Sequence, residues 1–364
     1  MKKRILSLIL ALSMVLSVLP LGAFAEGSLP ELVMGANGLP DCSDGSNGNG
    51  WRYISGTLYL DEGTYNFSST HPQNTGAGTR PVPAVRCMIE IRSGVEITGG
   101  SFGNSVTNYG TISSGTFQTM GGGVINEGTI KNGTFEGTVT NYGTIENGTF
   151  KGDVTNKTNG LIYGGTFQNK CSVTNYGTIT GNGTFNGTVT NNAGGEISDG
   201  TFKGDVENSG YIEKGTFNGE VTNNTSGTIF GGTFRGQVDN NGKITGGIFA
   251  AGLSTTPGTV TGGIFNGNTG LTGAHQVTVT NGSVSTVNDE GPRNADGTTG
   301  TAWDLYSYKD TTMTITASTE IFSLNGYPID GSPYTSSYPK PNDKKTVKFT
   351  MPDENVELNR TAEL

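Results

Sequence analysis

The chain has 364 residues, of which 60 are glycine and only 32% are hydrophobic, and its formal net charge is −9. An acidic chain repels nucleic acid and anionic lipid, so neither is expected as a partner. Its two histidines leave little material for proton transfer or for a zinc site.

Residues 1–25 have the features of a secretory signal peptide. Basic residues at positions 2–4 precede an apolar run that reaches Leu21, and Ala23 and Ala25 are the small residues that a signal peptidase reads. Cleavage after Ala25 leaves 19 Lys and Arg against 31 Asp and Glu, a net charge of 19 − 31 = −12. The sequence therefore predicts a secreted, extracellular protein, released or held at the cell surface, with no membrane insertion after the signal is removed.

The cysteine count fits an exported chain with few disulfides. Cysteine occurs only at Cys42, Cys87 and Cys171, and an odd number leaves at least one thiol outside any intramolecular disulfide. Cys42 and Cys87 are a candidate pair for the N-terminal region. Whether they meet the geometric requirements of a disulfide is not fixed by the sequence.

Residues 26–94 are expected to form an N-terminal β cap and the first coils of a longer structure. Residues 56–65 and 89–97 alternate apolar with polar side chains, which is typical of strands. The strand that leads to Gly63-Thr64-Tyr65, with the later Ile89-Glu90-Ile91 run, resembles the first coils of pectate-lyase-like parallel β-helix proteins. This resemblance implies an extracellular glycan context and a cap over the first sheet edge.

Residues 95–266 repeat a unit of about sixteen residues, a period that is typical of a β-solenoid. Each unit has three apolar columns in short β-prone runs, with isoleucine five residues before phenylalanine except for a one-residue slip at Ile179. The columns are Phe102, Phe117, Phe135, Phe150, Phe167, Phe185, Phe202, Phe217, Phe234, Phe249 and Phe265; Ile97, Ile112, Ile130, Ile145, Ile162, Ile179, Ile197, Ile212, Ile229 and Ile244; and Val106, Val124, Val139, Val154, Val173, Val189, Val206, Val221 and Val238.

These columns predict an all-β fold built around a single-stranded parallel β-solenoid. No unit can bury its three apolar side chains alone, so successive units must stack, and all of them run in one direction. About eleven coils at a spacing of about 4.8 Å would form a rod about 50 Å long. The sequence leaves the handedness and the oligomeric state open.

An asparagine follows each valine of the repeat by two residues. Residues two apart in a strand face the same side, so these asparagines are expected to point inward and to hydrogen-bond from coil to coil as a structural ladder. Extra residues occur mainly at the corner after the asparagine, as in 156–160 and 223–227, where a loop can absorb them. The ladder residues are Asn108, Asn126, Asn141, Asn156, Asn175, Asn191, Asn208, Asn223 and Asn240.

Residues 267–364 are expected to form a small C-terminal, β-sandwich-like module. Residues 275–287 have the pattern of two strands joined at Asn281-Gly282, and further strands are predicted near 311–322, 346–351 and 356–358. The run from Phe349 to Val356 (FTMPDENV) resembles the divergent internalin B-repeat modules of Gram-positive surface proteins. The resemblance implies a spacer or binding unit and carries over no catalytic residue.

The best candidates for chemistry lie on three neighbouring coils. Lys203 and Arg235 share one outward column, while Asp205 and Glu220 are neighbours in a second. Two adjacent carboxylates could perform acid–base chemistry on a polysaccharide, as a lyase or a glycoside hydrolase. With Glu207 and Asp239 in a third column, Asp205 and Glu220 could instead contact calcium; no other cofactor is expected. Exposed positions of a solvated rod are commonly charged, and that explanation is favoured over a site.

Three tyrosines are the candidate ligand-binding residues. Tyr109, Tyr142 and Tyr176 each follow a ladder asparagine, where their rings could stack on sugars. Tyrosine also covers the corners of β-rich surfaces, so a purely structural role is an equal alternative.

The sequence thus favours a secreted bacterial surface protein that is a scaffold or adhesin and not an enzyme. Its expected partner is an extracellular glycan or a host or bacterial surface. The alternatives are a calcium-assisted polysaccharide lyase or glycoside hydrolase on the solenoid face, and a purely structural stalk.

Overall fold

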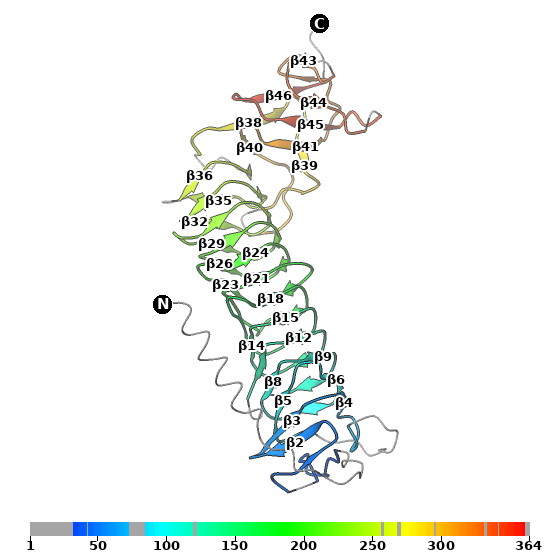
Figure 1. The fold of residues 1–364 in the computed structure, drawn as a ribbon. Coiled ribbons are helices and arrows are strands. Elements are labelled where there is room, and N and C mark those ends of the chain that lie inside the picture. Colours follow the sequence, from blue (N-terminus) through cyan, green and yellow to red (C-terminus); the bar gives the residue numbers. More distant parts are fainter. Residues whose placement is uncertain are drawn as a thin grey trace.

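A computed structural model describes residues 32–41, 43–72, 84–118, 122–255, 258–267, 271–294, 296–330, 333–340 and 342–360. Within these ranges the chain is all-β, with no helix. Its main body is a parallel β-solenoid of about ten turns, close to the predicted eleven coils. Figure 1 shows an elongated rod with the N-terminal strands at one end and a compact group of C-terminal strands at the other. The predicted signal peptide and Cys42 lie outside the described residues.

Each regular turn of the solenoid contains three short strands, one in each of three parallel sheets. The valine sheet contains β8 (Val106–Asn108), β11 (Val124–Asn126), β14 (Val139–Asn141), β17 (Val154–Asn156), β20 (Val173–Asn175), β23 (Val189–Asn191), β26 (Val206–Asn208), β29 (Val221–Asn223), β32 (Val238–Asn240) and β35 (Leu253–Thr255).

The isoleucine sheet follows next around each turn. It contains β6 (Glu96–Gly99), β9 (Thr111–Ile112), β12 (Thr129–Ile130), β15 (Thr144–Ile145), β18 (Leu161–Ile162), β21 (Thr178–Ile179), β24 (Glu196–Ile197), β27 (Tyr211–Ile212), β30 (Thr228–Ile229), β33 (Lys243–Ile244) and β36 (Thr259–Val260).

The phenylalanine sheet completes the turn. It contains β7 (Ser101–Phe102), β10 (Thr116–Phe117), β13 (Thr134–Phe135), β16 (Thr149–Phe150), β19 (Thr166–Phe167), β22 (Thr184–Phe185), β25 (Thr201–Phe202), β28 (Thr216–Phe217), β31 (Thr233–Phe234), β34 (Ile248–Phe249) and β37 (Ile264–Asn266).

The register of all three sheets is the predicted one. Valine pairs with valine, isoleucine with isoleucine and phenylalanine with phenylalanine in successive coils, and these side chains are buried. Phenylalanine rings from Phe102 to Phe265 stack with centroids 4.5–4.9 Å apart and planes within 14° of parallel. The one-residue slip at Ile179 leaves the pairing intact, because the extra residue enters the turn before β22.

The asparagine ladder is confirmed, since all nine side chains are buried. Asn108 donates from Nδ2 to Oδ1 of Asn126 at 2.7 Å, and the same bond repeats at 2.7–2.8 Å as far as Asn240. From Asn126 to Asn223, each Nδ2 also donates to a glycine carbonyl in its own turn at 3.0–3.4 Å. The ladder therefore satisfies buried amides and fixes the corner of each coil.

Two kinds of glycine are imposed by this geometry. Gly133 has φ = +139°, and a Cβ there would lie 3.2 Å from the Phe135 ring. At Gly143 a Cβ would lie 2.1 Å from the carbonyl oxygen of Gly128 in the coil before it. Close stacking at these corners thus requires residues without a side chain, and it explains much of the glycine content.

The N-terminal strands extend the solenoid and cover its first edge. β1 (Asn47–Gly48), β2 (Trp51–Ile54) and β3 (Thr57–Leu60) form an antiparallel meander, and β3 pairs in parallel with β5 (Met88–Ile91). β4 (Thr64–Asn66) pairs in parallel with β6. The predicted cap and first coils are therefore present as strands in the expected order.

The C-terminal strands form two facing sheets that continue from the solenoid. β40 (Leu305–Tyr308) pairs antiparallel with β37 and so extends the phenylalanine sheet. Beyond β40 the sheet continues in the order β38 (Ala274–Val279), β46 (Val356–Asn359), β42 (Ser323–Leu324) and β43 (Tyr327–Pro328). The second sheet has the order β39 (Val284–Val287), β41 (Thr312–Ala317), β45 (Thr346–Thr350) and β44 (Ser336–Ser337). Apolar side chains from both sheets pack between them.

The two strands and the Asn281-Gly282 turn expected at 275–287 are present, but the two strands do not pair with each other. Asn281 and Gly282 join β38 to β39, but β38 pairs with β40 and β46 while β39 pairs with β41. The chain therefore crosses from one sheet to the other at this turn. The physical reason is burial: Val277 and Val284 are both in the core between the two sheets.

Candidate functional site

The three predicted tyrosines lie in one column at the corner after the asparagine ladder. Tyr109, Tyr142 and Tyr176 are between 39% and 46% exposed. The backbone N–H of Tyr142 donates to Asn126 O at 2.7 Å, and Tyr176 donates likewise to Asn156 O at 2.8 Å. The tyrosines occupy alternate coils, so their backbones are about 10 Å apart at the usual strand spacing.

Charged residues fill the coils between these tyrosines. Glu127 stands between Tyr109 and Tyr142, and Lys157 stands between Tyr142 and Tyr176. The Lys157 ammonium lies 5.9 Å from the centroid of the Tyr176 ring, a cation–π distance. Burial, assisted by the nearby Glu127 and Glu90 carboxylates, raises the pKa of Tyr109. The column is thus a series of separated rings and not a continuous aromatic strip.

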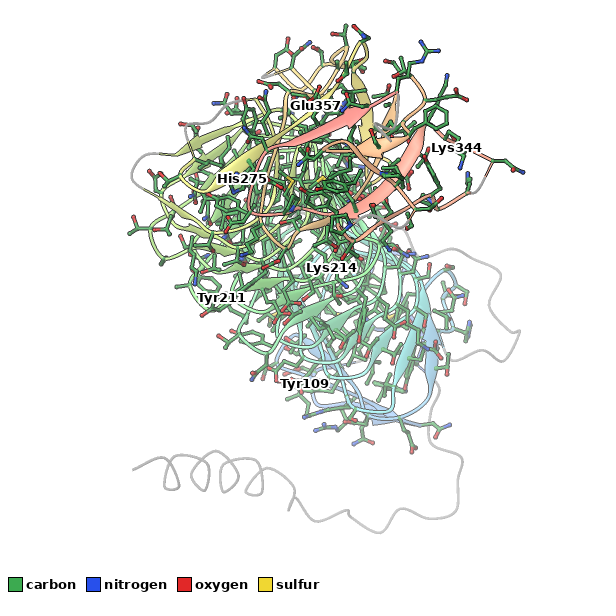
Figure 2. The ribbon with its side chains drawn as sticks, turned by 90° about the horizontal axis from the view of Figure 1, so that it is seen from above. Tyr109, Tyr211, Lys214, His275, Lys344 and Glu357 are labelled. Carbon is green, nitrogen blue, oxygen red and sulfur yellow. The ribbon has the colours of Figure 1, made fainter. Side chains whose placement is uncertain are left out.

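A second group of exposed rings, not singled out from the sequence, lies on the isoleucine sheet. Tyr163, Tyr211 and Phe230 are between 46% and 50% exposed. The rings of Tyr211 and Phe230 are stacked, with centroids 6.1 Å apart and planes at 28°. The repeat pattern in the sequence indicates their outward direction, because each is next to an inward isoleucine of the repeat. Figure 2 shows Tyr109 and Tyr211 projecting from the outside of the rod.

Asp205 and Glu220 are neighbours, as predicted, but their contact is a structural one. The Asp205 Oδ1 accepts a hydrogen bond from the backbone N–H of Glu220 at 3.0 Å, and both side chains are exposed. Asp153 makes the equivalent bond to the N–H of Ser172 at 2.9 Å. An aspartate before the valine therefore serves to tie one turn to the next at more than one place.

Arg235 is directed away from these carboxylates. Its guanidinium donates from Nε and Nη2 to the two oxygens of Glu290, at 2.9 and 2.7 Å, and these bonds raise the pKa of Arg235. Glu290 lies in the C-terminal module, in the loop between β39 and β40. Lys203, in the same column as Arg235, is exposed to solvent. Arg235 is therefore paired with Glu290 instead of completing a site with Asp205 and Glu220.

The weak calcium candidates are also spread along the rod. Glu207 and Asp239 are exposed on β26 and β32, and each pairs in register with Thr222 of β29, so two strand spacings separate them. Among the described residues, no group of three or more His, Cys, Asp or Glu side chains is placed to hold a metal ion. Calcium at Asp205, Glu207, Glu220 or Asp239 stays a prediction.

The cysteines within the described ranges are both buried. Cys171 lies in the turn before β20, where burial and the nearby Asp153 carboxylate raise the pKa of its thiol to about 12. Cys87 precedes β5 and is in the core. A pairing of Cys87 with Cys42 stays a prediction, because Cys42 is outside the described residues.

Two hollows are formed with the C-terminal strands. One, of about 560 Å³, runs between the solenoid and the loop before β41, with Glu213, Lys214 and Thr245 on one side and Thr312 on the other. Phe230 adjoins it, since its column places it between Glu213 and Thr245. The other, of about 690 Å³, lies within the C-terminal module and is lined mainly by polar side chains.

Comparison with models of known protein families, with curated proteins and with solved structures gave no match. The predicted resemblances to pectate-lyase-like proteins and internalin B-repeat modules therefore stay expectations. In the part of the chain that the structure describes, no helix is long and apolar enough to cross a membrane.

Proposed function

We propose that this protein is a secreted bacterial surface scaffold of the adhesin type, which binds extracellular glycan along a rigid rod. The observation that carries the proposal is the set of exposed aromatic rings held at fixed intervals on the solenoid. Tyr109, Tyr142 and Tyr176 occupy one column, while the stacked Tyr211–Phe230 pair stands on the isoleucine sheet.

Rings held by a rigid backbone are suited to carbohydrate. The apolar face of a sugar can stack on an aromatic ring with little loss of side-chain entropy, because tyrosine has only two side-chain torsions. The rod supplies rigidity through its stacked phenylalanines and its asparagine ladder, so the spacing of the rings is fixed. The acidic charge of the chain favours neutral glycans over anionic ones. The resemblance of the first coils to pectate-lyase-like proteins supports the same ligand class.

The experiment is a glycan-array and polysaccharide-depolymerisation screen of the chain from Glu26, with and without calcium. Binding without turnover supports the proposal, and the Tyr109→Ala/Tyr142→Ala/Tyr176→Ala variant then reports whether this column contributes. Ile125→Ala is the matched control, because Ile125 is an equally exposed apolar residue on β11.

Turnover that disappears in Asp205→Ala or Glu220→Ala would replace the proposal with the calcium-assisted lyase or hydrolase alternative. If the wild-type protein neither binds nor cleaves any glycan, the purely structural stalk becomes the better account.

A further inference from the structure

The hollow in the C-terminal module is built from four separate parts of the chain. It lies among β38, the turn between β42 and β43, the segment before β44 that contains Tyr334, and residues 354–359, which include β46; its volume is about 690 Å³. Figure 2, which looks down on the C-terminal module, labels Glu357 on β46. Its polar lining includes the side chains of Gln276, Asn325, Tyr334, Glu354, Asn355 and Glu357.

Asn325 holds one wall of the hollow in place. It stands in the β42–β43 turn with φ = +49°, and its Oδ1 accepts a hydrogen bond from the backbone N–H of Glu357 at 2.7 Å. Its Nδ2 donates to the carbonyl of Asn355 at 3.1 Å. On the opposite side, Asn355 Oδ1 accepts from the backbone N–H of Gln276 at 2.9 Å. These bonds fix the amide groups before any ligand arrives.

Hydroxyl groups lie against both carboxylates of the hollow. The Tyr334 hydroxyl donates to Glu354 Oε1 at 2.6 Å. The Thr280 hydroxyl is within hydrogen-bonding distance of Glu357 Oε1 and of Asn359 Oδ1, and its single proton can be donated to one of them at a time. The bond to Glu354 raises the pKa of Tyr334, so the phenol keeps its proton at neutral pH. A carboxylate has about four acceptor positions, so each of the two retains the capacity to accept from a ligand.

An aromatic pair borders the same hollow. The Tyr334 ring meets the Tyr327 ring edge to face, with centroids 5.8 Å apart. Tyr327 is half exposed and follows Gly326, which lines the hollow. A ligand seated there would therefore meet an apolar ring face at the rim and fixed polar groups within.

We propose that this hollow binds a neutral oligosaccharide. Adjacent sugar hydroxyls can donate to the Glu354 and Glu357 carboxylates and accept from amide N–H groups, while a sugar face packs on Tyr327. Two carboxylates at the site disfavour an anionic sugar. This inference rests on the proposed glycan-binding function and adds a second ligand contact, in the C-terminal module, to the tyrosine column of the solenoid.

The test is titration calorimetry of the chain from Glu26 with cellotriose, mannotriose, chitotriose and, as the anionic comparison, trigalacturonate. The Glu354→Gln/Glu357→Gln variant keeps the side-chain shapes and removes both charges, and Tyr327→Ala removes the exposed ring. Glu320→Gln is the matched control, since Glu320 is an exposed glutamate of the same module outside the hollow. Thermal unfolding of each variant establishes that it is folded.

A neutral trisaccharide is expected to bind at least tenfold more tightly than trigalacturonate. The Glu354→Gln/Glu357→Gln variant and Tyr327→Ala should each raise its Kd by about tenfold or more, with Glu320→Gln unchanged. The inference is overturned if these variants bind as the wild type does, or if trigalacturonate binds best. Loss of binding only in the Tyr109/Tyr142/Tyr176 variant would overturn it while leaving the proposed function standing, whereas absence of any glycan binding would overturn both.

Discussion

Arg235 on the phenylalanine side of the solenoid and Glu290 in the loop between β39 and β40 are joined by two hydrogen bonds, of 2.9 and 2.7 Å. The Glu290 side chain is only 8% exposed, and Arg293 Nη2 lies 3.7 Å from Glu290 Oε1. The ion pair thus links two parts of the chain that are far apart in sequence.

Removal of Arg235 should destabilise this junction by more than removal of both partners. Arg235→Ala leaves the buried Glu290 carboxylate without its main partner, and we expect a loss of about 1–3 kcal/mol, reduced from a fully buried pair because Arg235 is partly exposed. The double variant Arg235→Ala/Glu290→Ala should recover part of this loss. Urea unfolding of the single and double variants measures the coupling, and additive losses would show that the pair is not coupled.

The asparagine ladder should be more sensitive in its middle than at its end. Asn175 accepts from Asn156 and donates to Asn191, both at 2.8 Å, whereas the side chain of Asn240 has, among the described residues, only the bond from Asn223. Asn175→Ala leaves the buried Asn191 Oδ1 without its ladder donor and removes one acceptor of Asn156 Nδ2, which still donates to Gly160 O. It should cost about 3 kcal/mol, and Asn240→Ala about 1 kcal/mol. Chemical denaturation compares the two, and equal losses would contradict the ladder's energetic role.

Because the coils stack closely at the corner after the ladder, even the methyl group of alanine should destabilise the protein at Gly143. In Gly143→Ala the new methyl group would lie 2.1 Å from the Gly128 carbonyl oxygen, so neighbouring coils must separate. We expect a loss of about 2 kcal/mol or more in the free energy of unfolding. Gly291→Ala is the matched control, because a Cβ there meets no atom within 4 Å. A wild-type melting temperature for Gly143→Ala would refute the predicted contact.

Cys171 should be inert at neutral pH in the folded protein. Its thiol pKa is raised from 9.0 to about 12, so the reactive thiolate is scarce, and the side chain is fully buried. Iodoacetamide should label Cys171 only after unfolding, as followed by mass spectrometry of the peptide. Because the unfolded thiol ionises first, this group's contribution to stability is present below pH 9 and is lost as pH rises from about 9 to 12. Labelling of the native protein at pH 7 would contradict the burial.

The solenoid was predictable because each coil repeats the same local choices. Phenylalanine, isoleucine and valine recur in phase, and stacking places each residue over its equivalent, so one unit determines all the others. Even the slip at Ile179 is harmless, since a turn absorbs it. The C-terminal strands have no such repeat. Their pairing depends on contacts between distant segments, such as β37 with β40, and the strand Leu305–Tyr308 gave no distinctive signal.

The candidate sites on the solenoid were likewise predictable from the repeat, whereas those that involve the C-terminal module were not. The outward column of Tyr109, Tyr142 and Tyr176 follows from the repeat, and so does the outward direction of Tyr211 and Phe230, because each lies beside an inward isoleucine. The partner of Arg235 could not be found from the repeat, because Glu290 lies 55 residues away in a segment with no period. The hollow around Glu354 and Glu357 required the folded C-terminal module, since four separate segments form it.

The asparagine ladder also has a direction. Every described link runs from Nδ2 of one coil to Oδ1 of the next, so the amide dipoles add instead of cancelling, as peptide dipoles do in a helix. The oxygen end is closed at Asn108, which accepts from the N–H of Gly110, while at Asn240 the Nδ2 has no acceptor among the described residues. Hydrogen bonds in such a chain polarise one another, so the interior of the rod carries a lengthwise electric polarity, with its positive end toward the C-terminal module.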